Sequence, residues 1–465
     1  MKRMLRVFVL VNLILSACAP VSAPRPTPAP SATPFPIATA KHTNTPTATP
    51  TATPTPIPTI QVGNLSVPDP RVTNPELFDL RNPNAPIPQF ANAFNINPKD
   101  VLSGLHPEVE KPQGMPEFIT MRTTDGVALM MATRNEKGEW VWQNATPGIY
   151  WHAQGKFIGV YLAGDEVDEQ KDTVIKYFSY GALGLNGTVR PGPDIIERKP
   201  DKASKSFNVA HAGNMGVLFH YVAEPGKFPK YVNKNNVEEW MINRLKETLN
   251  VYKRYKPPFI FLEYNEPFHY KSVAWNPEYD PFREKYGNRW MEEYIYLAIK
   301  IFSDGGLNKT DFAIVINNDR AFDLNRAKNL HQKMVDARHN AFLKLSQDPS
   351  TQSWLTSNNI KEPGDIPILL GAQTSTKEIE SDDQIEKLAD MYKDLGGIIL
   401  TEVTLSSDKP PIQKQELENL LTLLKNNKCI RGLLIFNFSA EDNPNIIQTK
   451  IFDNTGKPNA TFFLY

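Results

Sequence analysis

Short apolar runs alternate with helical segments over about 300 residues of the chain, a scale typical of a barrel domain. The eight strand-like runs are 157–163, 181–189, 217–221, 259–264, 312–316, 368–370, 397–403 and 432–438. Most are rich in β-branched and aromatic residues, as in strands buried on both faces. Between two of them, Val237, Met241, Leu245 and Leu249 recur at helical spacing. This alternation predicts an α/β fold, a (β/α)₈ TIM barrel, with an open doubly wound sheet as the competing architecture.

The stretch before the barrel has the pattern of a smaller, mainly β domain. Runs 117–123, 127–133 and 139–142 are separated by turn sequences, including Thr124-Asp125-Gly126, which is typical of an antiparallel meander. We therefore place a small, mainly β domain at residues 61–152 and the barrel at residues 153–465. Residues 19–60 are mostly Pro, Thr, Ala and Ser, so they lack the apolar bulk to fold and should form a disordered linker.

Residues 1–18 have the pattern of a lipoprotein signal peptide. A basic start that includes Lys2 and Arg3 is followed by an apolar core, residues 7–15, too short for a permanent membrane span. The run Leu15-Ser16-Ala17-Cys18 resembles the lipobox of bacterial lipoproteins, whose cysteine is acylated. We predict lipid on Cys18 and an extracytoplasmic position at the cell surface, with membrane contact only through this anchor. An ordinary signal peptide with an incidental cysteine is the alternative.

The composition excludes several classes of partner. Lys+Arg and Asp+Glu both number 51, and no basic cluster indicates a nucleic-acid surface. If Cys18 is acylated, Cys429 remains as the single free thiol, and Cys and His show no zinc-ligand spacing. No Gly-x-Gly-x-x-Gly follows the first predicted strand, so a dinucleotide site has little support. We expect a monomer with no metal, no cofactor and no nucleic-acid partner.

Polar residues gather where the predicted strands end, and in a barrel these ends meet at one rim. They are His220 on the third strand, Asn265 and Glu266 on the fourth, Asn317, Asn318 and Asp319 after the fifth, Gln373 after the sixth, Glu402 on the seventh, and Phe436 and Asn437 on the eighth. Carboxylates and amides bond to hydroxyl groups, while flat rings cover the apolar face of a sugar. Two carboxylates about 5 Å apart can perform retaining glycoside hydrolysis, one as nucleophile and the other as proton donor.

Two short motifs, Asn265-Glu266 and Thr401-Glu402, extend this interpretation. With them, the chain from about residue 157 to its end resembles glycoside hydrolase family 10, mostly endo-β-1,4-xylanases on a (β/α)₈ barrel. The resemblance implies that Glu266 is the acid/base and Glu402 the nucleophile. Phe219-His220 and Asn318-Asp319 match two further motifs of the family.

The resemblance implies a retaining hydrolase of xylan-like, β-linked polysaccharide. Its substrate contacts would come from Asn265, His220, Gln373, Phe436 and Asn437.

The chain also departs from the family pattern. Ser375 stands where the family has a histidine that contacts the nucleophile, and the sugar-binding lysine after the second strand is missing. Two alternatives therefore stay open: a barrel that binds glycans at the surface without turnover, and another hydrolase family of the same clan. Glu263 is at odd spacing from Glu266, so we expect it on the opposite face of the strand in a structural role.

Overall fold

The computed structural model describes residues 56–436, apart from gaps at 112–116, 125, 146–147, 149–150, 152–154, 164–166, 179–180, 187–206, 266, 268–279, 377–378, 380 and 406–409. Cys18, Glu266 and Asn437 lie outside the described residues, as does almost all of the predicted linker. Within the described ranges, no helix combines the length and the apolar character needed to cross a membrane.

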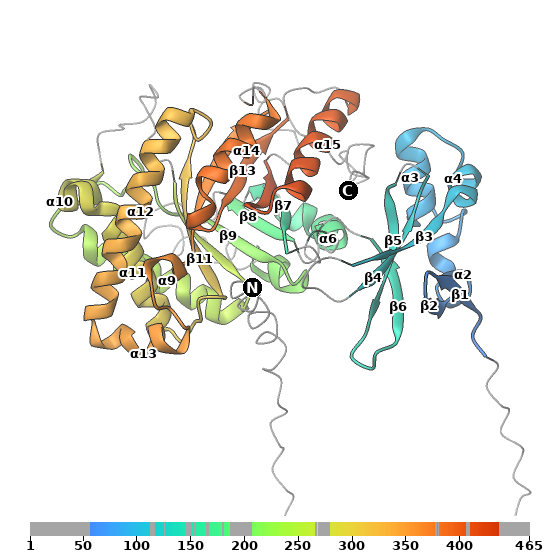
Figure 1. Cartoon of the computed structure of the whole chain (residues 1–465), viewed down its shortest axis with the longest axis horizontal. Coiled ribbons are helices and arrows are strands. Elements are labelled where there is room, and N and C mark those ends of the chain that lie inside the picture. The colour runs from blue at the N-terminus through green and yellow to red at the C-terminus, as the bar shows by residue number, and fades with distance from the viewer. Residues whose placement is uncertain are drawn as a thin grey trace, which may run out of the picture.

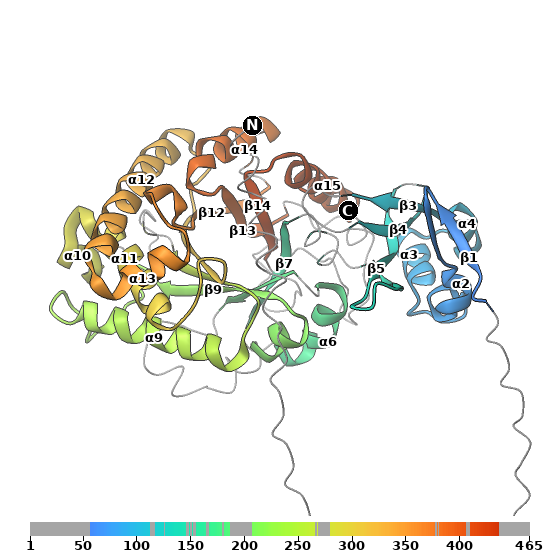
Figure 2. The same cartoon turned by 60° about the horizontal axis from the view of Figure 1, so that its bottom comes forward.

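Eight parallel strands close into a barrel in the order β10-β11-β12-β13-β14-β7-β8-β9, which confirms the predicted (β/α)₈ architecture over the open sheet. Their bounds are β7 (Phe157–Ala163), β8 (Ala182–Asn186), β9 (Gly216–Ala223), β10 (Ile260–Asn265), β11 (Phe312–Asn318), β12 (Ile368–Ser375), β13 (Ile398–Thr404) and β14 (Ile430–Ile435). Each predicted run overlaps one of these strands. Figure 2 shows the strands enclosed by a ring of helices.

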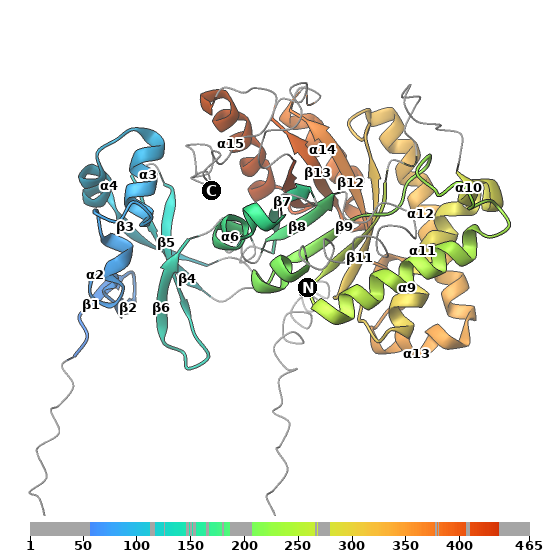
Figure 3. The ribbon, with the colours of Figure 1, turned by 180° about the vertical axis from the view of Figure 1, so that it is seen from behind.

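The helices of the barrel lie outside the strands (Figures 1 and 3). They are α6 (Val167–Phe178), α9 (Val237–Tyr255), α10 (Pro281–Tyr286), α11 (Trp290–Asp304), α12 (Leu324–Gln347), α13 (Pro349–Ser357), α14 (Asp382–Met391) and α15 (Pro410–Asn426), with short 3₁₀ turns η2 (Gly287–Arg289), η3 (Pro363–Asp365) and η4 (Lys393–Leu395). The predicted apolar stripe of α9 is buried, from Val237 to Leu249. That helix ends where Lys256 adopts a left-handed conformation.

Alternation along β10 divides its side chains between two cores. Ile260, Leu262 and Tyr264 belong to the large core shared with the helices, whereas Phe261 belongs to a separate core inside the barrel. The rings of Phe259 and Phe261 lie 4.6 Å apart, and the rings of Phe157 and Phe259 lie 5.9 Å apart. Aromatic residues near the strand starts therefore fill the barrel, and the polar side chains described inside it, such as Glu263 and Asn317, lie farther along their strands.

A buried lysine links the first and last barrel strands at their starts. Lys156 precedes β7, and its Nζ donates to the carbonyl oxygens of Asn427 at 2.7 Å and Ile430 at 2.6 Å, at the entry to β14. Burial, with a smaller effect of Arg431, lowers the pKa of Lys156 to about 8. The contact joins two segments that are far apart in sequence where the barrel closes.

The N-terminal unit contains a four-stranded antiparallel sheet in the order β3-β4-β5-β6, in which the last three strands are the predicted meander and the first was not predicted. Its elements are β1 (Thr59–Val62), β2 (Leu65–Pro68), α2 (Pro70–Thr73), η1 (Pro75–Phe78), α3 (Pro86–Phe94), α4 (Pro98–Gly104), β3 (His106–Glu110), β4 (Phe118–Arg122), β5 (Ala128–Arg134) and β6 (Trp140–Asn144). Figure 1 shows this unit beside α6 and α15. Tyr177 of α6 donates to Gln89 of α3 at 3.1 Å, and Lys414 of α15 lies over the ring of Phe94. Helix α3 therefore connects the N-terminal unit to the barrel.

Candidate active site

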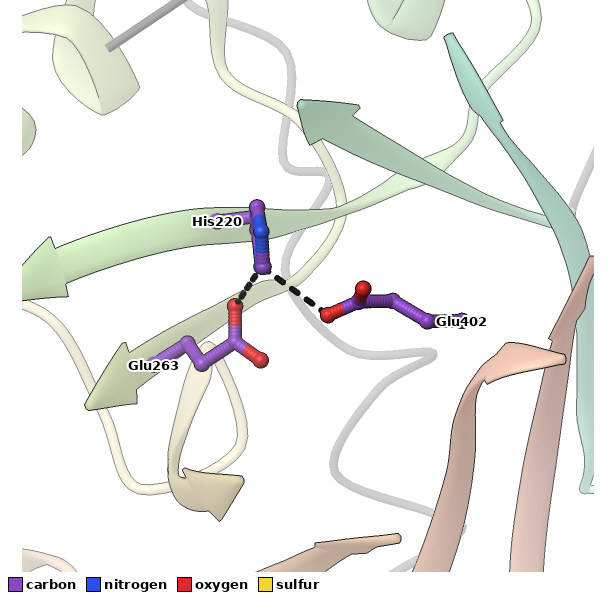
Figure 4. A group of neighbouring side chains, drawn as sticks. All are labelled: His220, Glu263 and Glu402. Carbon is purple, nitrogen blue, oxygen red and sulfur yellow. Dashed lines mark hydrogen bonds and ion pairs between the residues drawn. The ribbon is translucent and has the colours of Figure 1, made fainter. Parts of the chain in front are cut away.

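Three ionisable side chains from three strands meet inside the carboxyl-terminal half of the barrel (Figure 4). The Nδ1 atom of His220, on β9, lies 2.6 Å from Oε2 of Glu263 on β10 and 3.7 Å from Oε1 of Glu402 on β13. Their side chains are 6%, 0% and 9% exposed, respectively. Glu263 is thus sealed in the barrel, while Glu402 keeps some access to solvent.

The imidazole of His220 is held in its charged form by the two glutamates. Burial alone would lower the pKa of His220, but the charges of Glu263 and Glu402, together with the hydrogen bond to Glu263, raise it to about 9. At neutral pH the cluster therefore contains an imidazolium between carboxylates. A positive charge at this position attracts the carboxylate groups on either side of it.

A metal ion fits these three groups poorly. Two donor atoms that share a first-row metal, each about 2.0–2.1 Å away from it, lie roughly 3 Å apart. Nδ1 of His220 and Oε2 of Glu263 lie only 2.6 Å apart, a separation that suits a shared proton instead. The geometry therefore favours an ion pair with a hydrogen bond over metal coordination.

Glu402 has an unusual backbone for a residue inside a strand. Its φ is +51°, in the left-handed region, and the register between β13 and β14 shifts between Leu400 and Val403. A non-glycine residue in this region costs on the order of 1–3 kcal/mol, and such outliers cluster at functional sites. The irregular backbone is consistent with a position selected for where it directs the carboxylate.

Two side-chain amides donate to the carboxylate of Glu402. Asn317 Nδ2, from β11, lies 3.3 Å from Oε1, and Gln373 Nε2, from β12, lies 3.0 Å from Oε2. With His220 on the side of Oε1, the carboxylate is approached from three strands. These contacts fix its orientation and favour its anionic form.

Asn317 is the central residue of the amide network. It is fully buried, and besides Glu402 its Nδ2 donates to Oδ1 of Asn265 at 2.8 Å, while its own Oδ1 accepts from Thr401 Oγ1 at 2.7 Å. Gly371 on the neighbouring strand leaves room for it, because a Cβ there would lie 2.7 Å from Asn317 Oδ1. The fourth, fifth and seventh strands of the barrel are thereby joined through one amide.

Asn265 connects this network to a further carboxylate. Its Nδ2 donates to Oε2 of Glu224 at 3.3 Å, and Glu224 Oε1 lies 3.3 Å from Nζ of Lys227. Glu224, which follows β9, is itself buried. The side chain of Asn265 is therefore held at both ends, by Asn317 and by Glu224.

Two aromatic residues border the charged cluster. The ring of Tyr161, on β7, lies edge-on to His220 at 5.5 Å and to Phe436 at 5.6 Å. The pKa of Tyr161 is raised well above its usual value, first by burial and then by Glu263 and Glu402. Among the described residues its hydroxyl has no hydrogen-bond partner. It therefore stays protonated, as a donor beside the two carboxylates.

The structure brings several predicted residues into one network. His220, Gln373 and Asn265 belong to the group around Glu402, and Phe436 reaches it through Tyr161. Nothing is described for Glu266 or Asn437, so their roles stay predictions.

Sequence reasoning assigned no part in the site to three other residues, Glu263, Tyr161 and Asn317. Glu263 lies in the cluster, although we expected only a structural role for it. The sequence did carry a signal for this position. Glu263 lies two residues from both Phe261 and Asn265, so all three share one face of the strand. Tyr161 stands on the same inward face of β7 as Phe157. Asn317, rather than the motif pair that follows it, contacts Glu402.

Comparison with known proteins gives the fold but no family. No family profile matches the chain, and no curated protein matches it either. Among solved structures, a family 10 endoxylanase from a sugarcane soil metagenome is 13% identical over 68% of this chain and 97% of its own, with a TM-score of 0.50. A family 10 xylanase with a bacterial Ig-like domain, from termite gut, is 13% identical over 78% and 84%, with a TM-score of 0.49. Xylanase 10B of Thermotoga petrophila, solved with xylobiose, is 13% identical over 69% and 96%, with a TM-score of 0.47. At 13% identity, the likeness to the soil-metagenome endoxylanase supports the barrel fold alone.

Proposed function

We propose that this protein is a retaining glycoside hydrolase that cleaves β-linked, xylan-like polysaccharide. The observation that carries the proposal is the setting of Glu402. It stands in the carboxyl-terminal half of the seventh barrel strand, on an irregular backbone, with its carboxylate held by Asn317 and Gln373 beside the imidazolium of His220. Active sites of (β/α)₈ enzymes lie at this end of the barrel.

In the proposed reaction Glu402 attacks the anomeric carbon of the sugar and forms a glycosyl ester. The bond to the leaving oxygen breaks, and Glu266 gives that oxygen its proton. Glu266, now ionised, takes a proton from water, whose oxygen attacks the anomeric carbon and releases Glu402. Two inversions give net retention. Asn265, His220, Gln373, Phe436 and Asn437 would contact the sugar.

Release of reducing sugar from xylan and from mixed-linkage glucans tests this function. We expect the wild-type chain to release reducing ends, and proton NMR of the first products to show the β-anomer before mutarotation. The Glu402→Gln chain is the matched control for contaminating hydrolases. Absence of release from every β-linked polysaccharide, or an α-anomeric first product, would contradict the proposal.

A glycan-binding barrel without turnover is the second candidate. The observation that favours it is the sixth strand, where Ser375 occupies the place at which the resembling family has a histidine against the nucleophile. On this alternative the wild-type chain would bind xylo-oligosaccharides in isothermal titration calorimetry, and the same mixtures would contain no new reducing ends after prolonged incubation. Binding with slow but Glu402-dependent release would instead favour the enzyme.

We also propose that the protein is held at the outer face of the membrane by lipid on Cys18. The support is the signal-peptide pattern of the first residues, with Cys18 at its end. We expect a Cys18→Ser chain expressed in a bacterial host to move from the membrane fraction to the soluble fraction. An unchanged distribution of the variant would show that another feature retains the protein.

A further inference from the structure

We infer that Glu263 is a positioning residue that holds His220 as an imidazolium against Glu402. The inference rests on the proposed function, because it assigns Glu402 the part of nucleophile. It adds a third carboxylate to a mechanism that needs two. Glu263 itself is 0% exposed, so it cannot reach a substrate, and it acts through the histidine.

The first step of the argument is the geometry of the pair. The separation of 2.6 Å between His220 Nδ1 and Glu263 Oε2 is short for a charge-assisted hydrogen bond, so the proton on Nδ1 points at Glu263. Glu402 Oε1 lies 3.7 Å from the same nitrogen, which is too far for a hydrogen bond but within ion-pair range. Glu263 thus fixes the ring, and the ring presents its positive charge to Glu402.

The second step is the charge balance around the imidazole. Glu263 comes from β10, Glu402 from β13 and Glu224 from the end of β9, where Lys227 partly neutralises it. Tyr161 on β7 faces the ring with a protonated hydroxyl. A buried glutamate without a cation would be costly, since an unpaired buried charge destabilises a fold strongly. The positive charge of His220 offsets the cost of burying Glu263 inside the barrel.

The third step is what this arrangement does for Glu402. The sixth strand supplies an amide, Gln373, but no cation to the carboxylate. The imidazolium of His220, on β9, lies beside this carboxylate, and the contact with Glu263 is the largest influence that keeps the ring protonated. Without Glu263, the ring would lose the largest charge and the hydrogen bond that oppose burial, and only the smaller effects of Glu402 and Glu224 would remain to keep it charged. Glu402 would then face a ring that is less often charged and no longer held in place.

The test compares Glu263→Gln with the wild type by NMR titration of histidine-labelled protein, with the His220 signal assigned from a His220→Gln chain. We expect the wild-type ring to titrate near pH 9 and the variant ring at least one pH unit lower. The kcat on an aryl β-xyloside should fall about 10- to 100-fold, with KM nearly unchanged, because a hydrogen bond to a charged group is lost. The basic limb of the kcat profile should move to lower pH.

A double variant separates positioning from a general structural role. If Glu263 acts through the histidine, Glu263→Gln should cost no further activity once His220→Gln is present. The double variant should also unfold at higher denaturant concentration than His220→Gln alone, because the unpaired buried charge is gone. Additive losses of activity in the double variant would overturn the inference.

Glu293→Gln is the matched control. Glu293 is a buried glutamate of α11 paired with Lys344, in the helix layer rather than in the barrel. We expect it to lower stability without moving the His220 titration or the kcat profile. If the wild type turns over no glycan, the proposed function fails, while the titration still decides whether Glu263 holds the proton on His220. An unmoved titration in Glu263→Gln overturns the inference even in an active enzyme.

Discussion

Glu402→Gln is expected to lower kcat on β-linked substrates by on the order of 10⁴-fold or more, the scale of loss when one member of a catalytic unit is removed. The amide cannot form the glycosyl ester on which the double displacement depends. The fold should persist. The amide oxygen can still accept from Asn317, and Gln373 can turn its own amide, whose Oε1 has no partner among the described residues, toward the new donor.

Stopped assays on xylan measure the loss of turnover. Calorimetry with xylo-oligosaccharides measures whether the folded variant still binds. Affinity should remain within a few-fold of the wild type, because the substitution changes one charge and no shape. Added azide tests the role of Glu402 as nucleophile more directly, since a small anion can attack the anomeric carbon in place of the carboxylate. Retained hydrolysis in Glu402→Gln would remove this residue from the role of nucleophile.

Glu266→Ala is expected to show the second largest effect, and one that depends on the leaving group. Loss of the acid should slow hydrolysis of xylan by about 10²- to 10⁴-fold, the usual contribution of a positioned proton donor. An aryl glycoside with a good leaving group needs no protonation to depart, so its first step should be nearly unaffected. A burst of phenol followed by slow turnover should appear, because the ester then awaits a general base.

The comparison with Glu263→Gln decides which glutamate donates the proton, Glu263 or Glu266. A positioning residue should slow good and poor leaving groups alike, since both need the same nucleophile. If Glu263→Gln shows the leaving-group dependence and Glu266→Ala does not, Glu263 is the proton donor and Glu266 loses that role.

The alternation of strands and helices along the barrel could be predicted from the sequence because it depends on local patterns. A strand buried on both faces is apolar throughout, and a helix against it has an apolar stripe, so residues such as Val237 and Leu249 identify their element without knowledge of the rest. The rule that strand ends meet at one rim then placed His220, Asn265, Gln373 and Glu402 together.

The partners of those residues were decided only by the tertiary structure. Which side chains meet inside a barrel depends on register and on irregular backbone, as at Glu402, where a positive φ and a shifted register set the direction of the carboxylate. Gly371 makes room for Asn317 only because β11 and β12 pair in one register, in which Asn317 faces Gly371. Glu263 gains its partner because β9 carries His220 next to it. The sequence by itself determined which residue types reach the rim, since period and composition are local. Closure of the barrel determined which of them share a proton, because such contacts join residues 41 or more positions apart.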